Sequence, residues 1–305
     1  MTGAVYLLLY GALVAWLAPP ALTRLTRRGA APRLGVAAWL TAMAGVVVAW
    51  VAAMVVVVVP LVGGGPTPSA VVLCLELLGV AERRATLATP GAAALLLVGL
   101  AISTAVAFGV GRTVRGLRTS SAEHADAARM VGTPTAAEGV VVVSGDRPAA
   151  YCVVGRPHAI VLTTAAVAAL DGPQLDAVLA HENAHLAGRH HQLLMVLRAL
   201  AASLAQLPLF TRGAAAVADL LEMCADDRAV RRHGARPLVA GMLALASPPP
   251  PANGLAVAAT ATAVRAHRLL EPARRSTRWC HRVATSAVIA ATIAAPVVVN
   301  VLCHH

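Results

Sequence analysis

Four long apolar stretches constrain this chain more than any other feature. They contain no Asp, Glu, Arg or His, and they cover residues 3–20, 34–62, 85–111 and 283–303. A helix needs about 20 apolar residues to cross roughly 30 Å of hydrocarbon. Each stretch meets or approaches that length, so the sequence predicts four transmembrane helices. The composition agrees, because 58% of the residues are hydrophobic and only 13% are charged, against about 25% charged in soluble proteins.

The charged residues exclude several classes of protein. Basic residues number 25 against 14 acidic ones, and none of the basic residues is Lys. Walker-type phosphate loops, Schiff-base catalysis and the SxxK acylation motif all need Lys and are therefore excluded. The arginines cluster beside the apolar stretches, a pattern typical of membrane orientation rather than of nucleic-acid binding. We predict no direct contact with nucleic acid.

The distribution of Arg predicts the side of the membrane on which each connection lies, because cytoplasmic loops accumulate basic residues. The first connection carries Arg24, Arg27, Arg28 and Arg33 without an acid, and the third is rich in Arg at both ends. The second connection has balanced charges, and its apolar segment 67–80 is interpreted as an amphipathic helix at the outer interface. We expect a multi-pass protein of the cell membrane with connections one and three in the cytoplasm and both termini outside.

These observations predict three regions. Residues 1–111 form a membrane region with three spans, residues 112–282 form one cytoplasmic domain, and residues 283–305 carry the fourth span. The domain opens with an Ala-rich helix over 112–131. The predicted fold class is a mainly α membrane protein with four transmembrane helices and a cytoplasmic α+β domain between spans three and four.

Within the domain, short extended runs precede a series of helices. The runs cover residues 140–144, 150–154 and 159–163 and are separated by Gly- and Pro-containing turns, so we expect a small antiparallel sheet. The next helix starts at Asp171-Gly172-Pro173, because Pro at a first helical position has no N–H to lose. Pro208 breaks a later apolar segment.

That helix contains His181-Glu182-Asn183-Ala184-His185, the HExxH pattern. At positions i and i+4 both imidazoles lie on one helix face, within reach of a single Zn²⁺ ion. Glu182 lies beside them and can take a proton from metal-bound water. The alternative interpretation is an exposed polar helix face.

A catalytic zinc site also needs a third protein ligand and an open position for water. The candidate acids downstream are Asp219, Glu222, Asp226, Asp227 and Glu271. Glu222 and Asp226 are i and i+4 on a helix, so one can bind zinc while the other accepts the N–H of a ligating His. The alternative is a solvated acidic face paired with nearby arginines.

Other polar residues allow several interpretations. The candidate donors to an oxyanion are His190, His191, Arg228 and His233, each of which also fits a surface charge. The run 159–163 is a candidate edge strand for an extended substrate, or an ordinary core strand. Cys152 and Cys224 are interpreted as small buried hydrophobic residues rather than metal ligands.

The HExxH pattern, the Glu222–Asp226 segment and their place between a third and a fourth span resemble the BlaR/MecR-type antirepressor metallopeptidases, integral-membrane zinc gluzincins. The resemblance implies a gluzincin-type zinc peptidase domain in which His181, His185 and Glu222 bind zinc. It also implies that Glu182 is the general base and that Asp226 supports a zinc ligand.

Relatives of that type cleave a cytoplasmic winged-helix repressor after an outside sensor binds a β-lactam. We therefore expect a membrane-bound zinc endopeptidase that acts on such a repressor in signal-dependent gene regulation, with a homodimer as one expected assembly. The short segment after residue 283 and the lack of Lys predict a form without the penicillin-binding sensor domain. Two alternatives remain: a heat-shock-type membrane quality-control metalloprotease and a non-catalytic membrane signalling scaffold. Quality-control enzymes usually place a membrane hairpin between HExxH and the Glu. Residues 185–222 are too few to form the two full spans of such a hairpin.

Overall fold

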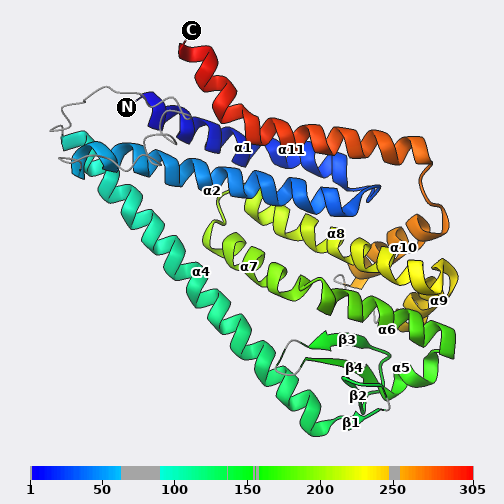
Figure 1. The fold of residues 1–305 in the computed structure, drawn as a ribbon. Coiled ribbons are helices and arrows are strands. Elements are labelled where there is room, and N and C mark those ends of the chain that lie inside the picture. The colour runs from blue at the N-terminus through cyan, green and yellow to red at the C-terminus, as the bar shows by residue number, and fades with distance from the viewer. Residues whose placement is uncertain are drawn as a thin grey trace.

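The computed structural model describes residues 2–62, 90–246 and 255–304, apart from single positions at 136, 154, 156 and 157. The amphipathic helix expected at 67–80 lies outside the described residues. Three helices lie side by side: α1 (Thr2–Thr26), α2 (Pro32–Val62) and α11 (Arg275–His304). A fourth long helix, α4 (Pro90–Val131), runs obliquely away from them toward a small sheet (Figure 1).

Three of the predicted spans are confirmed as apolar helices long enough to cross a membrane. They lie at Gly3–Thr26, Pro32–Val58 and Leu96–Val131, and they mark the chain as membrane-associated. α11 covers the fourth apolar stretch, but it is not among the candidate spans found in the described residues. The fourth span therefore stays a prediction.

Two of these helices extend beyond the apolar stretches that predicted them. α1 passes through Pro19 and Pro20 and continues to Thr26, whose hydroxyl accepts a hydrogen bond from Trp39 Nε1 at 3.2 Å. The Ala-rich helix expected at 112–131 is the second half of α4. The third candidate span thus continues without a break into the part of the chain that carries the sheet.

The sheet has four strands in the order β1-β2-β4-β3. They are β1 (Thr133–Pro134), β2 (Val140–Val143), β3 (Ala150–Val153) and β4 (Ala159–Thr163). The predicted antiparallel sheet is wrong, because β2 and β4 pair in parallel. β3 pairs with β4 in the antiparallel sense, so the third run of the sequence is inserted between the other two.

The central place of β4 also corrects the expectation that residues 159–163 form an edge for a substrate. All five residues of β4 are buried, and a continuous apolar run is typical of a strand that is covered on both faces. The end of α4 covers one of these faces with Ala125 and Ala128. Among the described strands, the edges are β1 and β3.

Six helices follow the sheet before α11. They are α5 (Thr164–Ala169), α6 (Gly172–Ala187), α7 (His190–Ser203), α8 (Pro208–His233), α9 (Ala235–Leu245) and α10 (Leu255–Leu270). α6 begins where the sequence predicted, because Asp171 and Gln174 form a capping box and a Pro occupies the first turn. α8 begins at Pro208, the predicted break.

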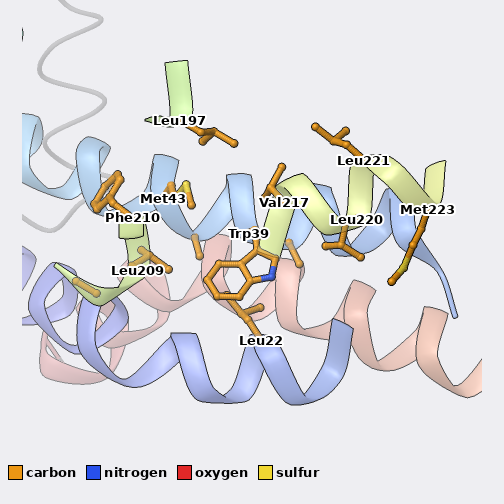
Figure 2. Close-up of a cluster of buried hydrophobic side chains, with 13 residues drawn as sticks. Leu22, Trp39, Met43, Leu197, Leu209, Phe210, Val217, Leu220, Leu221 and Met223 are labelled. Carbon is orange, nitrogen blue, oxygen red and sulfur yellow. The ribbon is translucent and has the colours of Figure 1, made fainter. Parts of the chain in front are cut away.

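The main hydrophobic core joins α8 to the membrane-region helices (Figure 2). Trp39 of α2 is fully buried, and it lies in one cluster with Phe210 and Val217 of α8. α8 runs antiparallel to α2: a Cβ atom at Gly213 would meet Trp39 and Met43, and one at Gly35 would meet Leu220. Figure 1 shows α7 and α8 as a hairpin alongside α2. The helix that carries Glu222 therefore shares its core with the candidate spans.

The close approach at Gly213 generates a stability prediction. Ala at this position would place its Cβ 2.9 Å from the ring of Trp39, which is buried and cannot move aside. We expect Gly213→Ala to cost about 1–3 kcal/mol from overpacking, measured as a lower thermal unfolding midpoint in detergent. Gly116→Ala in the exposed part of α4 meets no atom within 4 Å, so this control should keep or raise the midpoint because Ala favours helices. Equal effects of both substitutions would contradict the assigned contact.

Candidate metal centre

α6 and α8 pack together and bring the HExxH pattern against Glu222. The Nε2 atoms of His181 and His185 lie 3.1 Å apart. The Glu222 carboxylate lies 3.5 Å from the first of these atoms and 3.4 Å from the second. Both His side chains are buried, and Glu222 is partly exposed. The structure thus brings together the three residues that the resemblance proposed as ligands.

These distances fit a tetrahedral ion. A tetrahedral Zn²⁺ with ligands at about 2.0–2.1 Å separates any two ligand atoms by roughly 3.3 Å. The two imidazole nitrogens are 3.1 Å apart, Glu222 Oε2 lies 3.5 Å from His181 Nε2, and Glu222 Oε1 lies 3.4 Å from His185 Nε2. With one atom taken from each residue, the three ligand atoms lie within 4.8 Å of one another, and we call this set the ligand triangle. Two imidazoles and one carboxylate are also a usual zinc ligand set that keeps a fourth position for water. The residues present therefore fit zinc in both chemistry and spacing.

The second ring nitrogen of each His also has a neighbour. The Asp226 carboxylate lies 3.1 Å from His181 Nδ1, and His190 Nδ1 lies 3.0 Å from His185 Nδ1. Arg189 adopts a left-handed conformation with φ of 52° just before α7, and this turn returns His190 toward α6. Such contacts fix the orientation and the tautomer of a ligating imidazole. His190, a candidate oxyanion donor, therefore lies on the side of His185 that faces away from the ligand triangle.

The charges around the triangle suit metal binding. Burial raises the pKa of Glu222, but the His181 hydrogen bond and Arg265 outweigh burial and lower this pKa to about 2. Burial lowers the pKa of His185 to about 4, so its imidazole is neutral at pH 7. Burial also acts to lower the pKa of His181, but Asp226 and Glu222 raise it to about 9. A proton on His181 occupies the position that a cation would take, and metal binding would release it.

Glu182 lies on the same helix, in contact with the edge of the sheet. Burial raises the pKa of its carboxyl, while His181 and the Cys152 thiol oppose that shift. Cys152 of β3 is buried, and its Sγ atom lies 2.9 Å from His191 Nε2. Burial and the nearby Glu182 raise the pKa of Cys152, so it stays a protonated thiol rather than a thiolate ligand.

Arg265 of α10 is the residue that sequence reasoning missed. Its guanidinium donates hydrogen bonds to both Asp226 carboxylate oxygens, at 2.8 and 2.6 Å, and lies 2.9 Å from Glu222. Asp226 itself is fully buried, at 0% exposure. No local pattern links Arg265 to these acids, because they are far apart in the sequence and meet only when α10 packs near α8.

The other candidate residues lie away from the triangle. Asp227 pairs with Arg268 at 2.8 Å, and exposed Glu271 lies 3.8 Å from the ring of His267. Arg228 lines a small cavity beside His190, and His233 ends α8. Cys224 is partly buried. Asp219 lines a cavity of about 520 Å³ between α1, α8 and α10, which Glu222 and Arg265 also line.

One comparison with known proteins supports a class for this site. Residues 116–247 match the model of peptidase family M48, a segment that contains HExxH, Glu222 and Asp226. No curated protein and no solved structure matches the chain. The family match supports a metallopeptidase of the M48 type, a hydrolase. The narrower likeness to the antirepressor peptidases stays a prediction.

The contacts of Arg265 generate a second stability prediction. Arg265→Met removes the guanidinium that pairs with buried Asp226 and leaves His181 as its remaining partner, and breaking a buried ion pair costs about 3–5 kcal/mol. We expect a clearly lower thermal unfolding midpoint, measured in the presence of a chelator so that metal loss does not contribute. The control Arg236→Met changes an exposed residue and should shift the free energy of unfolding by less than about 0.5 kcal/mol. Equal midpoints for the two variants would contradict the role of Arg265.

Proposed function

We propose that this chain is a membrane-bound zinc endopeptidase. The observation that carries the proposal is the triangle of His181, His185 and Glu222, whose ligand atoms converge within 4.8 Å of one another in a segment that matches a metallopeptidase family. In this proposal these three residues hold zinc, Glu182 is the general base, and Asp226 supports His181 from behind.

The mechanism assigns one task to each group. Zinc bound at the triangle would polarise the scissile carbonyl and make a bound water acidic. Glu182 would act as the base that takes a proton and returns it to the leaving amine, and its burial-raised pKa suits both transfers. Asp226 keeps the His181 ring oriented, and Arg265 neutralises the two acids of α8 that face it.

The edge of the sheet supports binding of an extended substrate. β3 is an edge strand, and its Cys152 lies near the base Glu182. An extended peptide can add to an exposed edge through main-chain hydrogen bonds. We propose that the substrate strand pairs with β3, in place of the buried β4.

The packing of α8 supports a site close to the membrane surface. Met43 lies about 16 Å along α2 from Pro32 at a rise of about 1.5 Å per residue, and the start of α8 packs at that depth. Leu220 meets Gly35, near the Arg-rich end of α2. We propose that residues 112–282 form a cytoplasmic domain, that residues 283–305 return to the outside, and that the zinc centre lies at the cytoplasmic membrane surface.

For the substrate we propose a cytoplasmic protein, with a winged-helix repressor as the first candidate. The resemblance to antirepressor peptidases supports this choice, and a site on the Arg-rich side of the membrane is open to cytosolic proteins. Such cleavage would link an outside signal to gene regulation. A homodimer of the chain is part of the same proposal.

One observation favours a second candidate, membrane quality control. The hairpin formed by α7 and the first half of α8 lies between HExxH and Glu222 and packs along α2. α7 has 14 residues, and α8 reaches Glu222 within a similar length, so neither arm up to Glu222 is long enough for a full span. The position of the hairpin nevertheless resembles the membrane hairpin that is typical of quality-control enzymes. A destabilised membrane protein is therefore the second substrate candidate.

The zinc proposal predicts a separation of binding from catalysis. We expect about one zinc per purified chain, retained in Glu182→Gln with proteolysis reduced by about 10²–10⁴-fold. Glu222→Gln should lose zinc because it removes a ligand. The control Glu271→Gln changes an exposed acid and should keep both properties. Metal content by mass spectrometry and peptide cleavage test this. Zinc lost from Glu182→Gln but kept in Glu222→Gln would overturn the roles, and no zinc in any form would favour the scaffold.

The substrate proposal predicts cleavage that depends on Glu182. Each winged-helix repressor of the source genome is co-expressed with the wild-type chain or with Glu182→Gln, beside a destabilised membrane protein, and fragments are followed under envelope stress. We expect repressor fragments with the wild type only. If only the membrane protein is cut, the quality-control function replaces the repressor proposal. Equal survival of all substrates with both chains would contradict both substrate proposals.

A further inference from the structure

A second cavity, of about 780 Å³, lies at the turn between α1 and α2 and does not include the zinc ligands. Its walls come from four parts of the chain that are distant in sequence: this turn, the end of α8, the end of α10 and the start of α11. Six arginines and one aspartate, Asp227, line it. The arginines are Arg28, Arg33, Arg231, Arg268, Arg278 and Arg282.

Most of this positive charge is not neutralised. Among the described residues, only Arg268 of the six makes an ion pair, with Asp227 at 2.8 Å. Arg268 also donates hydrogen bonds to the carbonyl oxygens of Gly29 and Met223, so it closes the cavity rather than facing a ligand. The other five arginines line the same cavity and are exposed to solvent, and a bound anion would relieve the repulsion between them. Guanidinium stays charged and matches phosphate oxygens through paired N–H groups.

The helix that borders the cavity adds to this preference. Pro32, Arg33 and Leu34 line it and form the first turn of α2, which has no acidic residue. The first N–H groups of a helix have no partner inside the helix, and the dipole places partial positive charge there. The cavity therefore combines arginine side chains with a helix end, both of which bind phosphate.

The position of the cavity indicates where such a phosphate would be found. α1 and α2 are both candidate spans, so the turn that joins them must lie at a membrane surface, at the depth of lipid headgroups. A general bias for positive charge in cytoplasmic loops explains the number of arginines. This bias does not explain why arginines from four segments that are distant in sequence line one cavity.

We propose that this cavity is a binding site for a phosphate-bearing anion, either the headgroup of an anionic phospholipid or free phosphate. Basic pockets between membrane helices on the cytoplasmic side have the chemistry that binds such headgroups. The cavity volume lies within the range of about 300–1,000 Å³ that is usual for small-molecule sites. The proposal does not depend on the protease function.

The test uses the full chain in nanodiscs of phosphatidylcholine and two matched double variants. Arg278→Gln/Arg282→Gln removes two cavity arginines from α11. Arg274→Gln/Arg275→Gln removes the same charge from exposed positions nearby that do not line the cavity. One arm adds cardiolipin to the nanodiscs, and the other adds inorganic phosphate at constant ionic strength. The readout is the rise of the thermal unfolding midpoint with ligand, because a ligand that binds the folded state stabilises it.

We expect the wild type and the Arg274/Arg275 variant to be stabilised, and the Arg278/Arg282 variant to need about tenfold more ligand for the same effect. A response to cardiolipin alone identifies a lipid headgroup, and a response to inorganic phosphate identifies the free anion. No response of the wild type to either ligand, or equal responses of both variants, would overturn the site. If the Arg278/Arg282 variant does not fold, Arg231→Gln in the cavity and its neighbour Arg232→Gln outside it give the same comparison.

Discussion

The buried carboxylate of Asp226 joins the helices on which the rest of the site depends. It belongs to α8, accepts two hydrogen bonds from Arg265 of α10, and lies against His181 of α6. A charge with no exposure to water is tolerated only when it is paired and hydrogen-bonded. The relative positions of α6, α8 and α10 are therefore coupled to one another. The ligand triangle keeps its geometry because the group behind it cannot move without losing these bonds.

The same helix connects the site to the membrane region. Asp226 and Glu222 lie in the second half of α8, whereas its first half packs against Trp39 and Met43 of α2. A movement of α2 relative to α8 would thus reach the proposed metal ligand Glu222 through one helix. The anion cavity lies at the other end of the contact between α2 and α8, where α2 begins and α8 ends. There Arg268 pairs with Asp227, the residue that follows Asp226. The proposed protease site and the proposed phosphate site both include residues of α8 and α10.

The sheet shows which features local sequence patterns predict and which they do not. β2, β3 and β4 formed where the extended runs and turn residues predicted them, since these signals depend on neighbouring residues, whereas the two-residue strand β1 was not predicted. Their order did not follow, because the choice between parallel and antiparallel partners depends on how the β3–β4 pair turns back toward β2. All five residues of β4 are buried, which agrees with its central place in the sheet. Its unbroken apolar run was the one available sign of a central strand.

By itself, the sequence determined the apolar helices, the start of α6 at Asp171 and the spacing of His181 and His185 on one face. These features depend on hydrophobic length, capping and helical period, which are properties of short segments. Only the tertiary structure decided that Arg265 neutralises Asp226, that α8 packs into the membrane region, and that distant arginines line one cavity. Such contacts join residues far apart in the chain, and burial, rather than any local pattern, selects them.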